Sequence, residues 1–131
     1  MKSYKEFWYE LNNEFHFTVD VAADKNHHMT PEYFDAERNG LKQSWMNETV
    51  WCNPPYGDGI YDWMNKAKRE RYLALVSDTT SKTTIVMMVP FNTTINMTKY
   101  FNPNEIRFVG KLSFDGCYSF SGDLMLLIWK D

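Results

Sequence analysis

Apolar side chains near the start of the chain recur with the period of a helix. Four of them are spaced by three and four positions: Tyr4, Phe7, Trp8 and Leu11. This spacing predicts an amphipathic helix over residues 3–14, with Ser3 as a candidate N-cap. The pattern then changes to partial alternation over residues 15–21, which are rich in strand-forming residue types. We therefore predict a first strand that ends at Asp20-Val21, followed by a turn over residues 22–26.

Short apolar runs with strong stop signals follow in the next thirty or so residues. Residues 32–34 predict only a short second strand, because Pro31 disfavours a central position in a sheet. Asn39-Gly40 marks a turn, and residues 41–45 predict a helical turn. Residues 49–52 form a short apolar run of the buried type, and the sequence Asn53-Pro54-Pro55 predicts that this strand stops abruptly.

Helical periodicity returns after the glycines at 57 and 59. Ile60, Trp63, Met64 and Ala67 fall on one face, which predicts a helix from Ile60 towards Leu75. Asp62 near its start is favourable for the helix dipole. A polar linker over 77–83 then separates this helix from a strand over 84–89, which Pro90 closes.

The last third of the chain predicts a short helix and closing strands. The helix covers residues 93–101, and the strands cover 105–109, 111–114 and 123–129, with glycines at the joints. No internal repeat is visible. The order of elements predicts an α/β sandwich with a mainly parallel sheet and an antiparallel C-terminal hairpin.

The bulk properties are those of one ordinary domain over residues 1–131. The chain is 44% hydrophobic and 17% aromatic, which is enough to build a packed core. The net charge of -3 gives no overall attraction to a polyanion, so any contact with nucleic acid must be local. One basic stretch stands out, with Lys66, Lys68, Arg69 and Arg71, and its alternative interpretation is a solvated helix face.

Cysteine content and hydropathy argue against export and against a membrane span. Two cysteines, Cys52 and Cys117, do not form a disulfide framework, and no leader sequence opens the chain, so we expect a cytoplasmic protein. The longest apolar runs are far shorter than the ~20 residues that cross a membrane. Zinc ligation by His27 and His28 with either cysteine matches no metal-ligand spacing, and we expect a surface turn there.

Two predicted strands end in residues that are suited to chemistry. The carboxyl end of one carries Asp20 and Ala22-Ala23-Asp24, and that of the other carries Asn53-Pro54-Pro55-Tyr56. In open parallel sheets, ligands bind beyond the carboxyl ends of the strands. Consecutive prolines fix the backbone, so the Asn53 side-chain oxygen and the Pro54 carbonyl are held to accept the hydrogens of a planar amine such as that of adenine, while Tyr56 stacks on the ring. A rigid structural turn is the alternative.

An ordered series of motifs covers nearly the whole chain: 17–24, Tyr33-Phe34, Gly40-Leu41, Trp45, 50–57, Trp63, Lys66-Ala67 and 110–114. This series resembles the phage-type DNA adenine N6-methyltransferases, which are small Rossmann-like enzymes dependent on S-adenosylmethionine. The resemblance implies that Asn53, Pro54, Pro55 and Tyr56 are catalytic. It also implies that five residues contact the cofactor: Asp20, Val21, Ala22, Ala23 and Asp24.

Further expectations concern the ribose and the DNA. Asp35 or Glu37 is a candidate to bind ribose hydroxyls, with solvent exposure as the alternative. The target adenine must be flipped out of the duplex, and the basic stretch supplies the candidate DNA contacts, with Lys82 and Lys111 as further ones. Tyr118 and Phe120 are candidates for a loop near the base. We expect modest sequence specificity unless the protein forms a homodimer.

One departure from the family pattern leaves a second function open. The family usually has a Thr-Pro pair ahead of the first helix, where this chain has Ser3-Tyr4-Lys5. The alternative is therefore a catalytically weak or inactive module that binds DNA or a host protein, for example as a phage counter-defence factor. Methylation of RNA or of a protein amide is also chemically open, and protection of phage DNA against restriction is the natural biological hypothesis for the enzyme.

Overall fold

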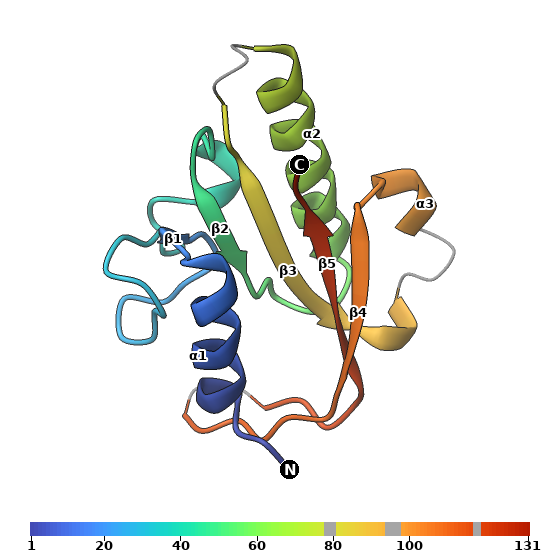
Figure 1. Ribbon diagram of the computed structural model, residues 1–131. Coiled ribbons are helices and arrows are strands. Elements are labelled where there is room, and N and C mark those ends of the chain that lie inside the picture. Colours follow the sequence, from blue (N-terminus) through green and yellow to red (C-terminus); the bar gives the residue numbers. More distant parts are fainter. Residues whose placement is uncertain (78–80, 94–97, 117–118) are drawn as a thin grey trace.

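The computed structural model has a five-stranded sheet between two layers of helix (Figure 1). It describes residues 1–77, 81–93, 98–116 and 119–131. The helices are α1 (Tyr4–Phe15), α2 (Ile60–Val76) and α3 (Thr98–Phe101), and the strands are β1 (Val19–Asp20), β2 (Thr49–Cys52), β3 (Thr84–Pro90), β4 (Glu105–Gly110) and β5 (Leu124–Trp129). Short 3-10 helices cover Gly40–Lys42 and Phe91–Thr93.

The sheet combines a parallel part with an antiparallel C-terminal part. Its strand order is β1-β2-β3-β5-β4, in which β1, β2 and β3 pair in parallel and β5 is antiparallel to both of its neighbours. The predicted α/β sheet with an antiparallel C-terminal pair is confirmed at this level. Because β1 and β2 are parallel neighbours, their carboxyl ends meet at one edge of the sheet, beside α1 in Figure 1.

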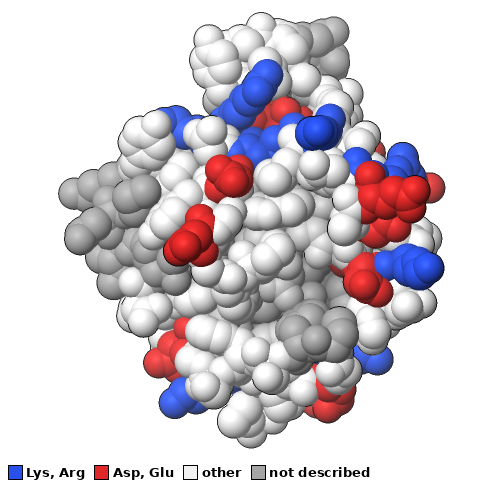
Figure 2. Space-filling view, turned by 180° about the vertical axis from the view of Figure 1, so that it is seen from behind, with Lys and Arg blue, Asp and Glu red and all other residues white. Residues whose placement is uncertain are grey.

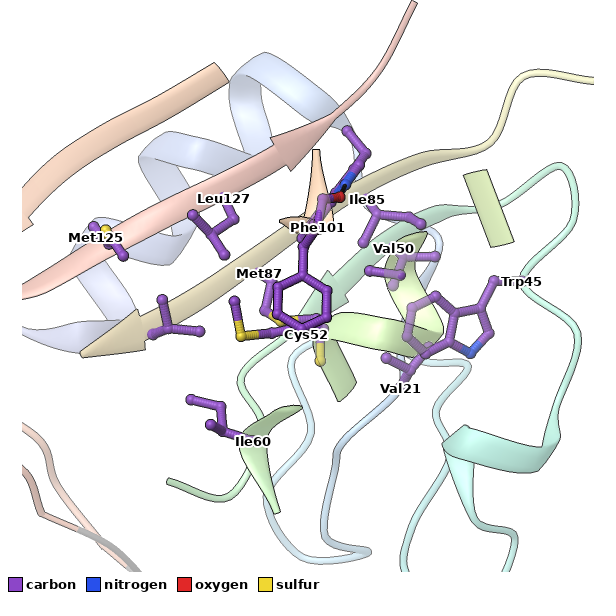
Figure 3. Packing of buried hydrophobic residues seen from close by; sticks show 14 of the residues in the cluster. Val21, Trp45, Val50, Cys52, Ile60, Ile85, Met87, Phe101, Met125 and Leu127 are labelled. Carbon is purple, nitrogen blue, oxygen red and sulfur yellow. Dashed lines mark hydrogen bonds between the residues drawn. The ribbon is translucent and has the colours of Figure 1, made fainter. Parts of the chain in front are cut away.

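The two faces of the sheet carry separate cores. On one face, Ile60, Met64 and Ala67 of α2 pack against alternate residues of the strands, together with Phe101 of α3 and the buried Trp45 (Figure 3). On the other face, Trp8 and Leu11 of α1 cover the remaining strand residues. The strands β3 and β5 are buried over nearly their whole length, which explains their continuous apolar sequences.

Helix α1 begins and ends as its sequence predicts. Ser3 is the N-cap, and its hydroxyl oxygen accepts a hydrogen bond from the backbone N–H of Glu6 at 3.1 Å. The helix ends at Phe15, and its C-cap His16 has a left-handed backbone (φ 59°) and donates its N–H to the Asn12 carbonyl at 2.8 Å. None of the helices in the described parts of the chain is long and apolar enough to cross a membrane.

The first two predicted strands are shorter than expected. The strand predicted over 15–21 is reduced to Val19–Asp20, because the backbone N–H of Phe17 bonds the Asn12 side chain at 2.8 Å instead of joining the ladder. The segment predicted as a strand over 32–34 forms one isolated bridge, between Asp20 and Tyr33. It still borders β1, since the Phe34 N–H bonds the Asp20 carbonyl at 2.9 Å.

The prediction of a strand over residues 111–114 is wrong. The chain leaves the sheet at Gly110, whose backbone has φ 84°, and crosses to the start of α1. There the Tyr4 N–H bonds the Ser113 carbonyl at 2.9 Å, and the Ser113 N–H bonds the Lys2 carbonyl at 3.0 Å. The helix predicted over 93–101 is found only as α3, and residues 94–97 lie outside the described residues, as do residues 78–80 of the predicted linker.

Gly40 allows the loop after residue 34 to pack directly on the backbone beside β1. A Cβ atom at this position would lie 2.0 Å from the Val21 carbonyl oxygen, so no other residue fits without movement. The indole N–H of the buried Trp45 donates to the Gly40 carbonyl at 3.0 Å. Gly40 and Trp45 together therefore hold this loop against the edge of the sheet where β1 ends.

Candidate active site

A cavity of about 500 Å³ opens at the carboxyl ends of β1 and β2. Four segments line it: the start of α1, the loop after β1, the loop after β2, and the connection from β4 to β5. The last of these reaches the cavity because Ser113 is bonded to the start of α1. Segments from both ends of the chain thus close over the edge of the parallel strands.

Asp20 contributes a buried carboxylate to this cavity. In the sheet register Asp20 lies opposite Trp51, one residue before the end of β2, and both Asp20 and Asn53 line the cavity. Asp20 is only 4% exposed, and its carboxylate accepts a hydrogen bond from the Met29 N–H at 3.0 Å. Burial raises the pKa of Asp20 to about 6, against the opposing effects of the backbone N–H groups of Met29 and Ala22 and of nearby His28.

The tetrapeptide Asn53-Pro54-Pro55-Tyr56 follows β2 directly and lines the same cavity. Asn53 and Tyr56 are half-buried, and the Tyr56 hydroxyl donates a hydrogen bond to the Asn53 side-chain oxygen at 2.8 Å. The Tyr56 ring also meets the Phe120 ring nearly at right angles, with 5.1 Å between their centroids. The structure therefore brings an amide oxygen, an aromatic ring and a buried carboxylate to one cavity.

The comparison with protein families agrees with this geometry. The family model described as DNA N-6-adenine-methyltransferase (Dam) matches residues 3–123. The chain belongs to this family. A comparison with curated proteins gives no match. The matched range includes all four segments that line the cavity, so the resemblance inferred from the motifs is confirmed.

Most of the cofactor-side residues predicted for this Dam-family chain meet at the cavity. Asp20, Ala22, Ala23 and Asp24 line it, and Val21 lines a smaller adjoining cavity of about 120 Å³. The two cavities share Ala22, Ala23 and Pro55. The two cavities therefore lie next to each other along the loop that follows β1.

The structure separates the two acidic candidates for ribose binding. Asp35 is half-buried and lines the smaller cavity, where its carboxylate also accepts a hydrogen bond from the Arg38 N–H at 3.0 Å. Glu37 is exposed and lines neither cavity. Of the two, only Asp35 is placed to meet a ligand.

The start of the Dam-family chain contributes lining residues for which the sequence predicted no role in a site. Tyr4 belongs to the apolar face predicted for the first helix, yet it lines the cavity, and its hydroxyl oxygen accepts a hydrogen bond from the Trp51 indole at 3.0 Å. Its ring lies 5.4 Å from that of Phe114. The signal was present in the sequence, because Ser3-Tyr4-Lys5 is where the chain departs from the family pattern.

Histidines after β1 also line the cavity, where the sequence predicted only a surface turn. The His28 ring stacks on that of Tyr33 at 3.9 Å, and His27 lies 3.6 Å from the Asp24 carboxylate. Cys52 is fully buried, which raises the pKa of its thiol, and Cys117 lies outside the described residues, as does Tyr118. Across the described parts of the chain, no group of three His, Cys, Asp or Glu side chains is arranged to hold a metal ion.

The basic stretch of α2 lies away from the cavity. Arg71 is buried, with its guanidinium bonded to the Thr83 carbonyl and 3.1 Å from the Asp131 carboxylate, so it is occupied within the protein. Lys66 pairs with Glu70 at 3.5 Å, and Lys68 lies 4.1 Å from the centroid of the Tyr100 ring. Arg69 is exposed, but none of these four residues lines either cavity.

The face opposite to the view of Figure 1 carries mixed charges among its described residues. In Figure 2 several Lys and Arg side chains gather in the upper part of that face with Asp and Glu between and below them, and the middle is uncharged. Mixed charges of this kind are typical of an ordinary solvated surface. The distribution does not favour α2 as the place where a DNA strand is held.

Proposed function

We propose that this protein transfers a methyl group from S-adenosylmethionine to the N6 amine of adenine in DNA. One Rossmann-like domain over residues 1–131 would carry both binding and catalysis. The single observation that supports this most strongly is that Asn53-Pro54-Pro55-Tyr56 and Asp20 line one cavity in a chain of the Dam family. A methyl-transfer enzyme needs its donor and acceptor side by side, and these two groups of residues meet that need.

The cavity residues fit the chemistry of the cofactor. A volume of about 500 Å³ is within the range of small-molecule sites. The buried Asp20 carboxylate suits the cationic amino group of the methionine moiety, and Asp35 suits hydroxyls in the adjoining cavity. When bound, S-adenosylmethionine supplies an electrophilic methyl group on a sulfonium. Ala22 and Ala23 would leave the backbone accessible between the two acidic residues.

Asn53 and Pro54 would orient the amine that receives the methyl group. The lone pair of an adenine amine is delocalised into the ring, so it becomes available only when its two hydrogens are held out of the ring plane. The Asn53 side-chain oxygen and the Pro54 carbonyl are acceptors for these hydrogens, and two prolines fix the backbone between them and Tyr56. Because an amide does not take up a proton near neutral pH, the role of Asn53 is orientation of the amine.

Tyr56 would support the base itself. Its hydroxyl is bonded to Asn53, which fixes the ring relative to the amide oxygen. A base that leaves the duplex loses its stacking partners at a cost of a few kcal/mol, and contact with an aromatic ring recovers part of that cost. The Asn53 side-chain oxygen and the Tyr56 ring would thus contact the same base from adjacent positions.

The test is transfer of a labelled methyl group to unmethylated plasmid DNA. We expect Asn53→Ala to lower kcat by about 100-fold or more, since one preorganised acceptor is removed. Asn65→Ala is the matched control, because Asn65 is exposed on α2 and lines neither cavity. Full activity of Asn53→Ala would refute the mechanism. Absence of both transfer and cofactor binding in the unaltered protein would instead favour the non-enzymatic binding module.

A further inference from the structure

The location of the cavity determines where DNA must be held, if the proposed function is correct. A flipped adenine that enters the cavity remains joined to two flanking phosphates, so these phosphates lie at the cavity mouth. Phosphate contacts by Lys and Arg supply most of the affinity for DNA of any sequence. The net charge of -3 gives no overall attraction, so cations at the mouth itself have to supply it.

Many basic side chains are already occupied within the protein. Those with a carboxylate partner are Lys2, Lys66, Arg71, Arg107 and Lys130. Arg38 and Lys68 lie over aromatic rings. Among the basic side chains that the structure describes, those with neither kind of partner are Lys5, Lys25, Lys42, Arg69, Lys82 and Lys111. These are the cations that remain available to a phosphate.

Half of that set belongs to the segments that line the cavity. Lys5 itself lines it, in the first turn of α1. Lys25 lies between two lining residues, Asp24 and Asn26, in the loop after β1. Lys111 begins the crossing that ends at Ser113, which lines the cavity and is bonded to the start of α1. All three lysines are exposed, and they come from three different segments around one opening.

The other three available cations do not belong to the segments that line the larger cavity. Lys42 ends the 3-10 helix Gly40–Lys42, whose first residue lines only the smaller cavity. Lys82 precedes β3 at the amino ends of the parallel strands, which is the edge of the sheet opposite to the cavity (Figure 1). Arg69 lies on α2, among residues that line neither cavity. Of the available cations, Lys5, Lys25 and Lys111 are therefore the ones that belong to the segments around the larger cavity.

We infer that Lys5, Lys25 and Lys111 form the phosphate-binding rim of the cavity and hold the DNA strand on either side of the flipped base. The mouth also carries Asp24 and Asp115, which repel phosphate. The rim lysines have to offset that repulsion, so binding depends on them strongly. Attraction by a few lysines beside carboxylates gives modest affinity that falls steeply as salt is added.

The experiment is binding of a fluorescent random-sequence DNA duplex by the full chain, followed by anisotropy at several salt concentrations. We expect Lys5→Glu, Lys25→Glu and Lys111→Glu each to weaken binding about tenfold, and the triple variant by about 100-fold or more. The neutral variants Lys25→Gln and Lys111→Gln should each lower the slope of log K against log salt by about one. Arg69→Glu and Lys82→Glu are the matched controls, expected to stay within about twofold of the unaltered protein.

The outcomes separate this inference from the proposed function. If the unaltered protein binds the duplex and the rim variants bind it equally well, the inference is overturned while DNA methylation stands. The inference is also overturned if Arg69→Glu or Lys82→Glu weakens DNA binding more than the rim variants do. If the unaltered protein binds no DNA even at low salt, both the inference and the proposed substrate fail. Thermal unfolding of each variant verifies that a loss of binding is not a loss of fold.

Discussion

The Tyr56 hydroxyl donates a hydrogen bond to the side-chain oxygen of Asn53, three residues earlier in the chain, at 2.8 Å. The phenol donates and the amide oxygen accepts, so this bond holds the Asn53 oxygen at a defined place beside the Tyr56 ring. The tyrosine thus sets the orientation of the residue proposed to hold the target amine.

Tyr56→Phe tests that positioning role. The variant keeps the ring and loses only the hydroxyl, so the Asn53 amide oxygen loses the hydrogen bond from residue 56. We expect kcat to fall about tenfold, which corresponds to the loss of one hydrogen bond, while the dissociation constant for DNA changes little. Tyr56→Ala should lower kcat and also raise the dissociation constant for DNA, because the ring is lost as well. Steady-state methyl transfer and DNA binding distinguish these outcomes, and unchanged kcat in Tyr56→Phe would contradict the assignment.

The pKa of Asp20 predicts how cofactor binding depends on pH. Only the ionised carboxylate attracts a cationic amino group, and burial raises the pKa of Asp20 to about 6. We therefore expect the affinity for S-adenosylmethionine to rise as pH increases through 6 and to level off above it. Calorimetric titrations between pH 5 and 8 measure this. Asp20→Asn should bind weakly with no step near pH 6, and an identical step in that variant would assign the titration to another group.

The raised pKa of Asp20 also predicts how the stability of the fold depends on pH. The folded protein holds the Asp20 proton more tightly than the unfolded chain, in which an aspartate has a pKa near 4. The contribution of Asp20 to the free energy of unfolding is therefore fully present below about pH 4 and is lost as pH rises through 6. Urea unfolding across this range should show a smaller decline with pH in Asp20→Asn than in the unaltered protein. Parallel pH profiles of the two proteins would exclude this role.

The sequence predicted the elements that rest on local periodicity and on strong punctuation. Helix α1 and strand β2 lie where their patterns place them, because Ser3 and the pair Pro54-Pro55 leave few alternatives. The motif Asn53-Pro54-Pro55-Tyr56 was identified for the same reason. Its chemistry follows from the residue types, which need no knowledge of distant contacts.

Features that depend on distant contacts could not be predicted in this way. Residues 111–114 alternate like a strand, but the start of α1 offers Ser113 a backbone partner outside the sheet. Arg71 resembles its basic neighbours in sequence, and only the fold shows that the Thr83 carbonyl and Asp131 surround it. The place of Lys5 at the cavity mouth likewise depends on how the first residues of the chain meet the connection from β4 to β5.

Gly40→Ala should destabilise the fold at the edge of the parallel strands. The added Cβ would lie 2.0 Å from the Val21 carbonyl oxygen, and backbone on both sides has to move to relieve the contact. We expect the free energy of unfolding to fall by about 2–4 kcal/mol, as for other cases of overpacking. Gly59→Ala is the control, since a Cβ there meets nothing within 4 Å, and it should cost less than about 1 kcal/mol. Equal stability of the two variants in urea would disprove the close-approach argument.

The absence of a side chain at Gly122 leaves space for the Phe120 ring beside Tyr56. A Cβ on residue 122 would lie 2.9 Å from the tip of the Phe120 ring, so Gly122→Ala should push that ring away from Tyr56, with which it now makes a nearly perpendicular contact. We expect a loss of about 1–2 kcal/mol of stability, the size of one aromatic pair with part of its burial.

A double-mutant cycle separates this effect from a general strain at Gly122. In a Phe120→Ala background the contact with Tyr56 is already absent, and the new methyl group meets no ring. Gly122→Ala should then have almost no further effect, so the two changes should be far from additive. Urea unfolding of the four proteins measures the coupling. Additive losses would mean that Gly122 acts on the backbone of the connection itself and not through the ring that borders the candidate base site.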